Sequence, residues 1–175
     1  HTRQKNLLLR DLDELVNQQL AKMLFANPQR IDYYDRYQEI IDAYNAEQNR
    51  ATIEKTFMDL MELASSLDTE QQRYVREGFS SDEELSVYDL LFSENLTKQE
   101  IEAIKKVSVD LLTKIKQQIA KLDHWTDKQE TKAIVDNLIR KTLWQELPNS
   151  YDVSDIQTYQ KKIYEYVYMR YPEVA

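Results

Sequence analysis

The residues of this chain whose types and spacing could do chemistry lie mainly between positions 124 and 132. Glu130-Thr131-Lys132 is a Glu-x-Lys triplet, and Asp127 stands shortly before it. In one class of nucleases, such a triplet and an upstream Asp hold magnesium and activate water. That arrangement needs strands to bring the carboxylates together, whereas this triplet falls in the first turns of an expected helix. We therefore interpret it as an exposed helix face.

The residue types needed for metal, thiol and nucleotide chemistry are scarce. The only histidines are His1 and His124, far apart, and there is no Cys, which excludes zinc–thiolate sites, disulfides and thiol nucleophiles. A phosphate-binding loop needs several Gly, and Gly78 is the only one. We predict no catalytic, cofactor-binding or metal-binding residue, and we expect His124 to face solvent or to cap a helix.

The charge balance limits the partners that the chain can bind. There are 31 acidic and 23 basic residues, giving a net charge of -8, which disfavours binding to nucleic acid. No apolar run approaches the roughly 18 residues that span a bilayer, so we expect no membrane partner. The start resembles no signal peptide and lacks an initiator Met. We expect a cytoplasmic fragment of a longer protein.

Helix boundaries are marked clearly. One Gly and three Pro in 175 residues favour long helices joined by short polar loops. Capping boxes, in which a Ser or Thr precedes a Glu or Gln by three residues, predict five helix starts. They are Thr69 with Gln72, Ser81 with Glu84, Thr97 with Glu100, Thr126 with Gln129, and Ser154 with Gln157. Asn27-Pro28 predicts another start, Gly78 a helix end, and Pro148 a break.

Apolar spacing agrees with these marks. The first helix presents a face of Leu8, Leu12, Leu15, Val16, Leu20, Met23 and Leu24. A second pattern runs over 33–44, loses phase over 45–51 and resumes over 53–67. We favour one long helix here over two, because no Gly or Pro interrupts it. Further helices are expected over 69–77, 82–92, 101–122, 134–143 and 156–167. The sequence thus predicts an all-α bundle of about seven helices forming a single domain, residues 1–175.

Tyrosines concentrate in the last helix. Six of the 12 follow Pro148: Tyr151, Tyr159, Tyr164, Tyr166, Tyr168 and Tyr171. Tyr159, Tyr166 and Tyr171 share a stripe with Ile163, whereas Tyr164 and Tyr168 fall on another. Either neighbouring helices cover both stripes, or the second stripe forms a protein interface, for which aromatic residues with a polar tip are suited. Base stacking is disfavoured by the acidic balance.

Several blocks resemble one family. The segment Glu83-Glu84-Leu85-Ser86-Val87-Tyr88-Asp89-Leu90-Leu91-Phe92 resembles the E-E-L-x-F/Y-Y-D-x-L segment in the C-terminal region of type I restriction endonuclease R (motor) subunits. Trp125 with Lys128 resembles the D-W-x-x-K element of that region, although His124 replaces the usual Asp or Asn. Leu147-Pro148-Asn149-Ser150-Tyr151 and the span 159–172 resemble its L-P-x-x-Y and V-Y-x-x-Y-P ending. The resemblance covers roughly residue 39 to the end.

The resemblance implies a non-catalytic helical domain of an ATP-dependent, DNA-translocating endonuclease. Residues 1–26 would be a helix connecting it to the upstream helicase domains. Its partners would be those domains and the methyltransferase and specificity subunits of a bacterial, cytoplasmic restriction–modification complex. ATP and Mg²⁺ would belong to the parent enzyme, with no cofactor in this chain.

Eight residues are candidates for an interface or a structural knot. They are Leu85, Tyr88, Asp89, Leu91, Phe92, Trp125, Tyr164 and Tyr168. For the residues of the 82–92 helix, the alternative is simple burial within the domain.

A second hypothesis is a DNA- or nucleotide-contacting regulatory module within the motor subunit. Six lysines could form a positive strip that contacts phosphates. They are Lys98, Lys105, Lys106, Lys114, Lys116 and Lys121.

Overall fold

The computed structural model describes residues 2–173, and their side chains from Gln4 onward; His1 lies outside the described residues. Within that part of the chain there are eight α-helices, two short 3-10 helices and no strand, which confirms the predicted all-α class. The chain divides into two compact units, residues 1–78 (unit 1) and 79–175 (unit 2). That these units fold as one domain stays a prediction.

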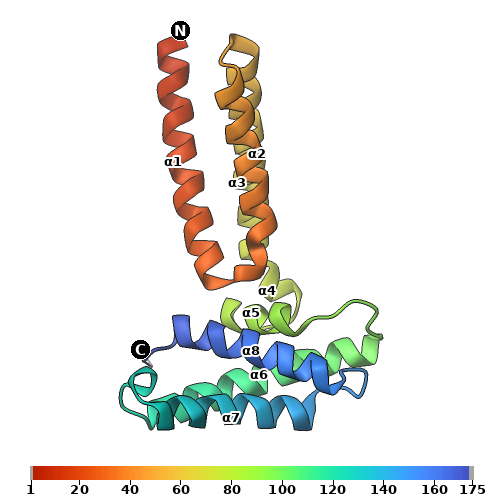
Figure 1. Ribbon diagram of the computed structural model, residues 1–175. Helices are drawn as coiled ribbons and strands as arrows, with labels where there is room; N and C mark the ends of the chain where they lie inside the picture. Colours follow the sequence, from red (N-terminus) through yellow and green to blue (C-terminus); the bar gives the residue numbers. More distant parts are fainter. Residues whose placement is uncertain (1, 174–175) are drawn as a thin grey trace. The chain divides into compact units, whose positions relative to one another are not determined.

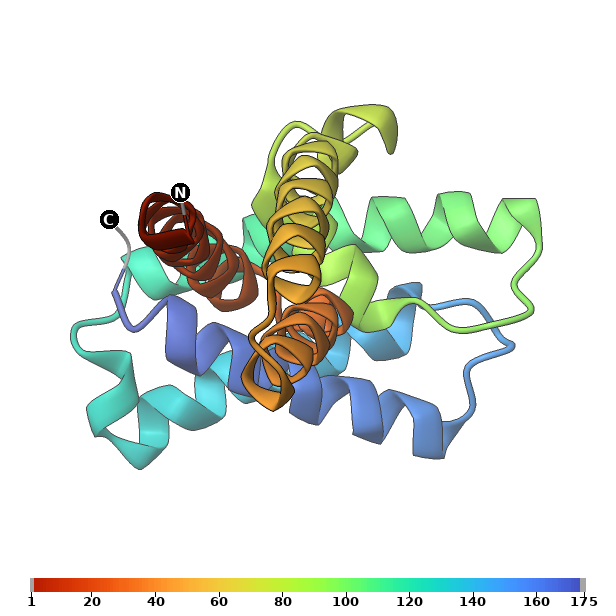
Figure 2. The ribbon, with the colours of Figure 1, turned by 90° about the horizontal axis from the view of Figure 1, so that it is seen from above.

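Unit 1 contains three long helices. They are α1 (Thr2–Ala26), α2 (Ile31–Ala46) and α3 (Arg50–Gln71), with the 3-10 helix η1 (Pro28–Arg30) after α1 and the short α4 (Arg73–Arg76) after α3. Figure 1 shows these helices lengthwise and Figure 2 nearly end-on. Lys5 bonds Glu54 and Gln19 bonds Asp68, both across 49 residues, so α1 and α3 run parallel.

The long helix expected over 33–67 is wrong. The chain turns between α2 and α3, where Glu47 is extended (φ -154°, ψ 121°). Asn49 then caps α3, its side chain accepting a 2.9 Å hydrogen bond from the Thr52 backbone amide. A polar stretch has no apolar face to bury, so it does not continue the helix. The turn lets α2 and α3 pack against each other, as Figure 1 shows.

The core of unit 1 is an apolar seam along these helices. Its buried members are Leu9, Val16, Leu20, Met23, Tyr37, Ile53, Leu60, Leu63 and Leu67. The expected face of α1 is partly wrong, because Leu8 and Leu15 are 54% and 65% exposed. The apolar face of α1 is wider than the surface that α2 and α3 cover. Leu9 and Val16 lie on the covered part of that face, whereas Leu8 and Leu15 lie on the uncovered part.

Unit 2 contains four helices. They are α5 (Asp82–Leu91), α6 (Lys98–Ala120), α7 (Gln129–Glu146) and α8 (Val153–Arg170), with the 3-10 helix η2 (Trp125–Asp127) before α7. Each helix packs on the next, and α5 also packs on α8. The buried interior includes Leu85, Leu111, Ile115, Ile139 and Ile163. It is an apolar core enclosed by all four helices.

The predicted helix boundaries have mixed outcomes. Ser81 and Thr97 are N-caps as predicted, Pro28 stands at the start of η1, and Gly78 has a positive φ of 84°. The break at Pro148 is also confirmed, because α7 ends at Glu146.

Three expected capping boxes are wrong. Thr69 lies inside α3, where its hydroxyl bonds the Ser65 carbonyl, so the short helix of this region begins only at Arg73. Thr126 lies within η2, and α7 starts after it. Ser154 lies within α8, because Asp152 two residues earlier forms the box instead.

Candidate functional site

Most of the α5 candidates lie inside unit 2. Leu85 and Leu91 are fully buried, Tyr88 is nearly so, Asp89 is half-buried, and Phe92 is 43% exposed. Three acidic residues in the first turn stabilise the positive end of this helix. The buried side chains pack against α6 and α8. Burial within the domain, the alternative given for these residues, describes all of them except Asp89 and Phe92.

Aromatic rings extend from the α5 core to the unit surface. The Tyr88 ring lies 5.5 Å from Phe79 and 5.8 Å from Phe92 between centroids. Lys105 of α6 lies about 6 Å above both Phe79 and Tyr88, as a cation–π contact. Phe92 is therefore the edge of a buried aromatic cluster, and its exposed face is what a partner could reach.

Trp125 is an internal anchor with two tyrosines beside it. The indole is fully buried and its Nε1 donates a 2.7 Å hydrogen bond to the Tyr171 carbonyl. Its ring centroid lies 6.1 Å from Tyr164 and 5.8 Å from Tyr168, both edge-on. Tyr164 is half-buried, and burial raises the pKa of its hydroxyl. Trp125 thus fixes the second tyrosine stripe, of which Tyr168 is 38% exposed.

The other C-terminal tyrosines bond inward. Tyr166 is buried with Ile163, as their shared stripe predicts. The Tyr151 hydroxyl donates a 2.6 Å hydrogen bond to the Leu91 carbonyl, at the end of α5. The Tyr171 hydroxyl donates to Glu83, and burial raises its pKa far above the ordinary value. These bonds join residues 60 and 88 positions apart, so no local pattern could have predicted them.

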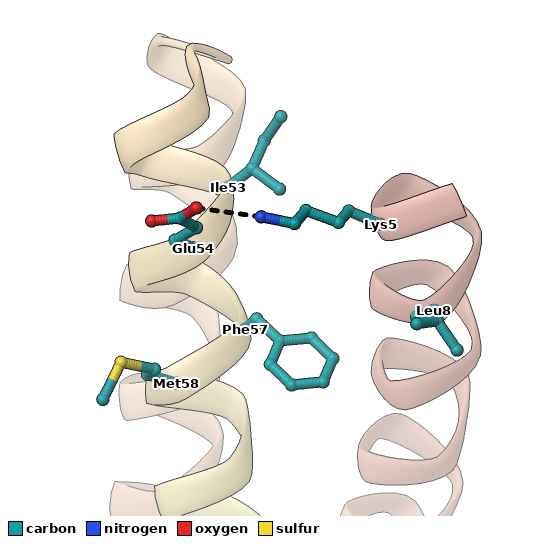
Figure 3. Close-up of a pocket in the computed structure, with 6 residues that line it drawn as sticks. All are labelled: Lys5, Leu8, Ile53, Glu54, Phe57 and Met58. Carbon is teal, nitrogen blue, oxygen red and sulfur yellow. Dashed lines mark hydrogen bonds and ion pairs between the residues drawn. The ribbon is translucent and has the colours of Figure 1, made fainter. Parts of the chain in front are cut away.

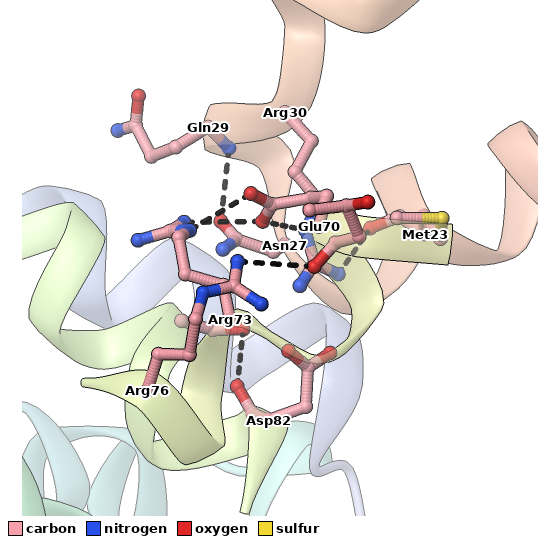
Figure 4. Close-up of polar contacts among 10 residues, drawn as sticks. Met23, Asn27, Gln29, Arg30, Glu70, Arg73, Arg76 and Asp82 are labelled. Atoms are coloured by element: carbon pink, nitrogen blue, oxygen red, sulfur yellow. Dashed lines mark hydrogen bonds and ion pairs between the residues drawn. The ribbon is translucent and has the colours of Figure 1, made fainter. Parts of the chain in front are cut away.

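Unit 1 contains a buried charge cluster that sequence reasoning missed. Arg30 and Glu70 are 3% and 6% exposed, and the Arg30 Nε lies 2.9 Å from a Glu70 oxygen. Figure 4 shows Arg73 bonding the same carboxylate, at 2.8 Å, and Arg30 also bonding the Met23 carbonyl. Burial opposes ionisation of Glu70, but the hydrogen bonds from Arg73 and Arg30 outweigh it and hold its pKa below the ordinary value. The cluster ties the ends of α1 and α3 to η1.

An apolar groove lies between α1 and α3 of unit 1. Figure 3 shows Leu8, Phe57 and Met58 lining it, with the Lys5–Glu54 ion pair at 2.9 Å across it. Its volume is about 390 Å³. The groove exists because Leu8 and Met58 remain largely exposed beside the packed seam.

The residues considered for chemistry do not converge. Glu130 is exposed in the first turn of α7, and the Thr131 hydroxyl bonds the Trp125 carbonyl at 2.6 Å. His124 is in the left-handed region (φ 47°) and lies 3.1 Å from Glu173, both exposed. Among residues 2–173, no group of three His, Asp or Glu side chains is placed to hold a metal.

The lysines of α6 do not form one free strip. Lys114 bridges Asp110 and Glu146 at 2.9 and 3.1 Å. Lys116 pairs with Glu83 at 2.7 Å. These carboxylates neutralise two of the six charges on which the DNA-contacting hypothesis depends.

None of the helices described over 2–173 is long and apolar enough to span a membrane.

The fold is an all-helical module whose aromatic residues are shared between core and surface. Comparison with known families gives a match over residues 1–171 to "Type I restriction enzyme HindI endonuclease subunit-like, C-terminal". The chain therefore belongs to this family of C-terminal regions of type I restriction enzyme subunits, which confirms the resemblance. No curated protein and no solved structure matches it.

Proposed function

We propose that the chain is a non-catalytic assembly domain that docks the motor subunit of a type I restriction enzyme onto its methyltransferase core. The observation that carries the proposal is the match to the C-terminal family over 171 residues, together with exposed apolar and aromatic side chains on a chain of net charge -8. Exposed aromatic residues of this kind are enriched at protein interfaces.

The partners follow from this role. The methyltransferase and specificity subunits would bind the chain, and the upstream helicase domains would adjoin it. ATP and Mg²⁺ would bind only in the upstream domains, which would carry out DNA translocation. The whole enzyme would act in the bacterial cytoplasm. DNA would contact this chain weakly or not at all, since its net charge is -8 and two of the α6 lysines are paired within the chain.

Co-elution in size-exclusion chromatography tests the proposal. The purified chain should co-elute with the methyltransferase core, and a motor subunit lacking the chain should fail to do so while keeping its DNA-dependent ATPase activity. A truncated motor subunit that still assembles with the core would overturn the proposal. Titration of the chain with duplex DNA at low salt should give no binding.

Substitution of Tyr164 and Tyr168 by Ala tests the second tyrosine stripe as part of the interface. The double variant should bind the core more weakly than the chain itself. If both core binding and stability are unchanged, the stripe has no such role.

A further inference from the structure

A second groove, in unit 2, is lined by cationic, apolar and amide side chains. It lies between α7 and α8 and has a volume of about 480 Å³. Arg140, Lys141 and Trp144 line it from α7, and Val153, Ile156 and Gln157 from α8. Its lining contains two cations and no carboxylate, in a chain whose net charge is -8. The groove is therefore a local positive site on an acidic protein.

The two cations are available to a partner. Within the described part of the chain, no ion pair or cation–π contact involves Arg140 or Lys141, and both are exposed. Lys114 and Lys116 of α6 differ, since each is paired with a carboxylate of this chain. An Arg and a Lys one residue apart on a rigid helix can bind carboxylates at low entropic cost.

Trp144 provides an apolar anchor next to these cations. Trp144 lies four positions after Arg140 and three after Lys141, so all three side chains share one helix face. The indole is 58% exposed, Val153 beside it is 54% exposed, and Ile156 forms the buried floor. Trp and Arg are the residue types that most often dominate binding energy at interfaces. Trp144 was absent from the residues singled out by sequence, because it falls outside the buried stripe of its helix.

The surface around the groove has the length of a short helix. At the end of the groove, Gln160 of its lining donates a 3.0 Å hydrogen bond from α8 to Asp136 of α7. Farther along, Lys132 lies 6.0 Å above the exposed ring of Tyr168. Lys132 and Trp144 are 12 positions apart on α7, or about 18 Å along the helix axis, which is about the length of a three-turn helix.

We propose that the α7–α8 groove binds an acidic amphipathic segment, about three helical turns long, from a subunit of the methyltransferase core. An aliphatic or aromatic side chain of that segment packs against Trp144 and Val153. Its Asp or Glu side chains pair with Arg140 and Lys141. The inference rests on the proposed function for the source of the segment, but its chemistry comes from the groove alone.

Nucleic acid fits the groove less well. A phosphate backbone binds through several cations at once, whereas the groove offers two. A peptide with two or three carboxylates placed around one apolar residue matches both the charges and the anchor.

Selection from a library of random 15-residue peptides tests the groove without assuming any partner. Peptides retained by the 175-residue chain should be enriched in Asp and Glu around a large apolar residue. Their affinity should fall at least about tenfold for Trp144→Ala and for the double variant Arg140→Glu/Lys141→Glu. The matched control Lys106→Glu/Lys121→Glu makes the same change in net charge at two exposed positions, one within α6 and one at its C-cap, and should bind within about twofold.

Three outcomes would overturn the groove proposal. They are the absence of acidic enrichment among retained peptides, equal binding by the groove and control variants, and binding of single-stranded oligothymidylate that the groove variants abolish. Co-elution of the same variants with the methyltransferase core separates this inference from the proposed function. A core that binds the chain and all variants equally refutes the groove alone. A chain that binds acidic peptides through the groove but no core refutes the proposed function alone.

Discussion

Among the described residues, the buried charged side chains lie in unit 1, whereas the buried polar groups of unit 2 are hydroxyls and an indole. Arg30 and Glu70 are enclosed in unit 1, while unit 2 buries Trp125, Ser108 and the Tyr151 hydroxyl. A buried charge pair is strongly destabilised when one partner is lost, but a neutral donor to a backbone carbonyl loses only one hydrogen bond. Unit 1 should therefore be sensitive to pH and to charge removal, and unit 2 to loss of aromatic volume.

The two units can be followed separately in solution. Both tryptophans, Trp125 and Trp144, lie in unit 2, whereas helices in both units contribute to far-UV circular dichroism. Urea unfolding monitored by both signals therefore distinguishes a change in unit 1 from one in unit 2. It also tests the predicted single domain, since one domain requires the two transitions to coincide.

The largest expected effect is that of Trp125→Ala. Loss of a fully buried indole, and of its bond to the Tyr171 carbonyl, should lower the free energy of unfolding by about 4 kcal/mol. Urea denaturation followed by circular dichroism measures the change. The control is Trp144→Ala, where a 58% exposed indole is removed and the cost should stay within about 0.5 kcal/mol. Equal costs for the two variants would contradict the burial of Trp125.

Glu70→Gln tests the charged cluster of unit 1. The substitution keeps the side-chain shape but leaves the buried Arg30 guanidinium without its carboxylate, at a cost of about 3 kcal/mol. Circular dichroism should show the loss. Glu62→Gln on the exposed face of α3 is the control and should change little. If the urea midpoint of the tryptophan signal shifts as much as that of circular dichroism, the two units unfold together. If the tryptophan midpoint is unchanged, they unfold separately.

The pH dependence of the stability difference between the wild type and Glu70→Gln provides a third test. Its effect cannot exceed the cost of Glu70→Gln at neutral pH. The pKa of Glu70 is lowered in the folded state, so its ionised form stabilises the fold above the ordinary Glu pKa of about 4.3. That contribution is lost as the pH falls through the folded-state pKa. The gap in urea midpoint between the wild type and Glu70→Gln should stay constant from neutral pH to about pH 5 and narrow below about pH 4. A gap that widens on acidification would contradict the assignment.

Sequence reasoning located features that depend on neighbouring residues and missed those that depend on distant ones. The caps at Ser81 and Thr97 were predicted because each capping side chain accepts a hydrogen bond from the backbone amide three residues later. The Arg30–Glu70 pair joins residues 40 apart, and no short-range periodicity encodes such a contact. The turn between α2 and α3 was missed for a different reason. It uses Asn49 as a cap rather than Gly or Pro, so no helix-breaking residue marks it in the sequence.

Among the candidate site residues, sequence identified the aromatic types but not their exposure. Trp125 and Tyr164 were singled out together, and the structure places their rings in contact. Whether Trp125 or Trp144 faces solvent depends on which side of α7 and η2 the rest of unit 2 covers. That is a property of tertiary packing, and it explains why the exposed groove tryptophan was overlooked.

The smallest expected effects on stability come from substitutions of helix caps. They allow the start of α3 in unit 1 to be compared with the start of α8 in unit 2. Asn49→Ala and Asp152→Ala should each cost about 1 kcal/mol, because each side chain satisfies a backbone amide that would otherwise lack a partner. Asp152 should cost slightly more, since its box also includes the Asp155 carboxylate and its charge favours the helix N-terminus.

Ser154→Ala discriminates between the two proposed starts of α8. The structure places Ser154 inside the helix, where Ala is the better helix former, so stability should be unchanged or slightly higher. Urea midpoints of the three variants provide the comparison. A loss of about 1 kcal/mol for Ser154→Ala, with none for Asp152→Ala, would restore the start expected from sequence. It would also shift the first turn of α8, including Val153, and thereby change the end of the α7–α8 groove.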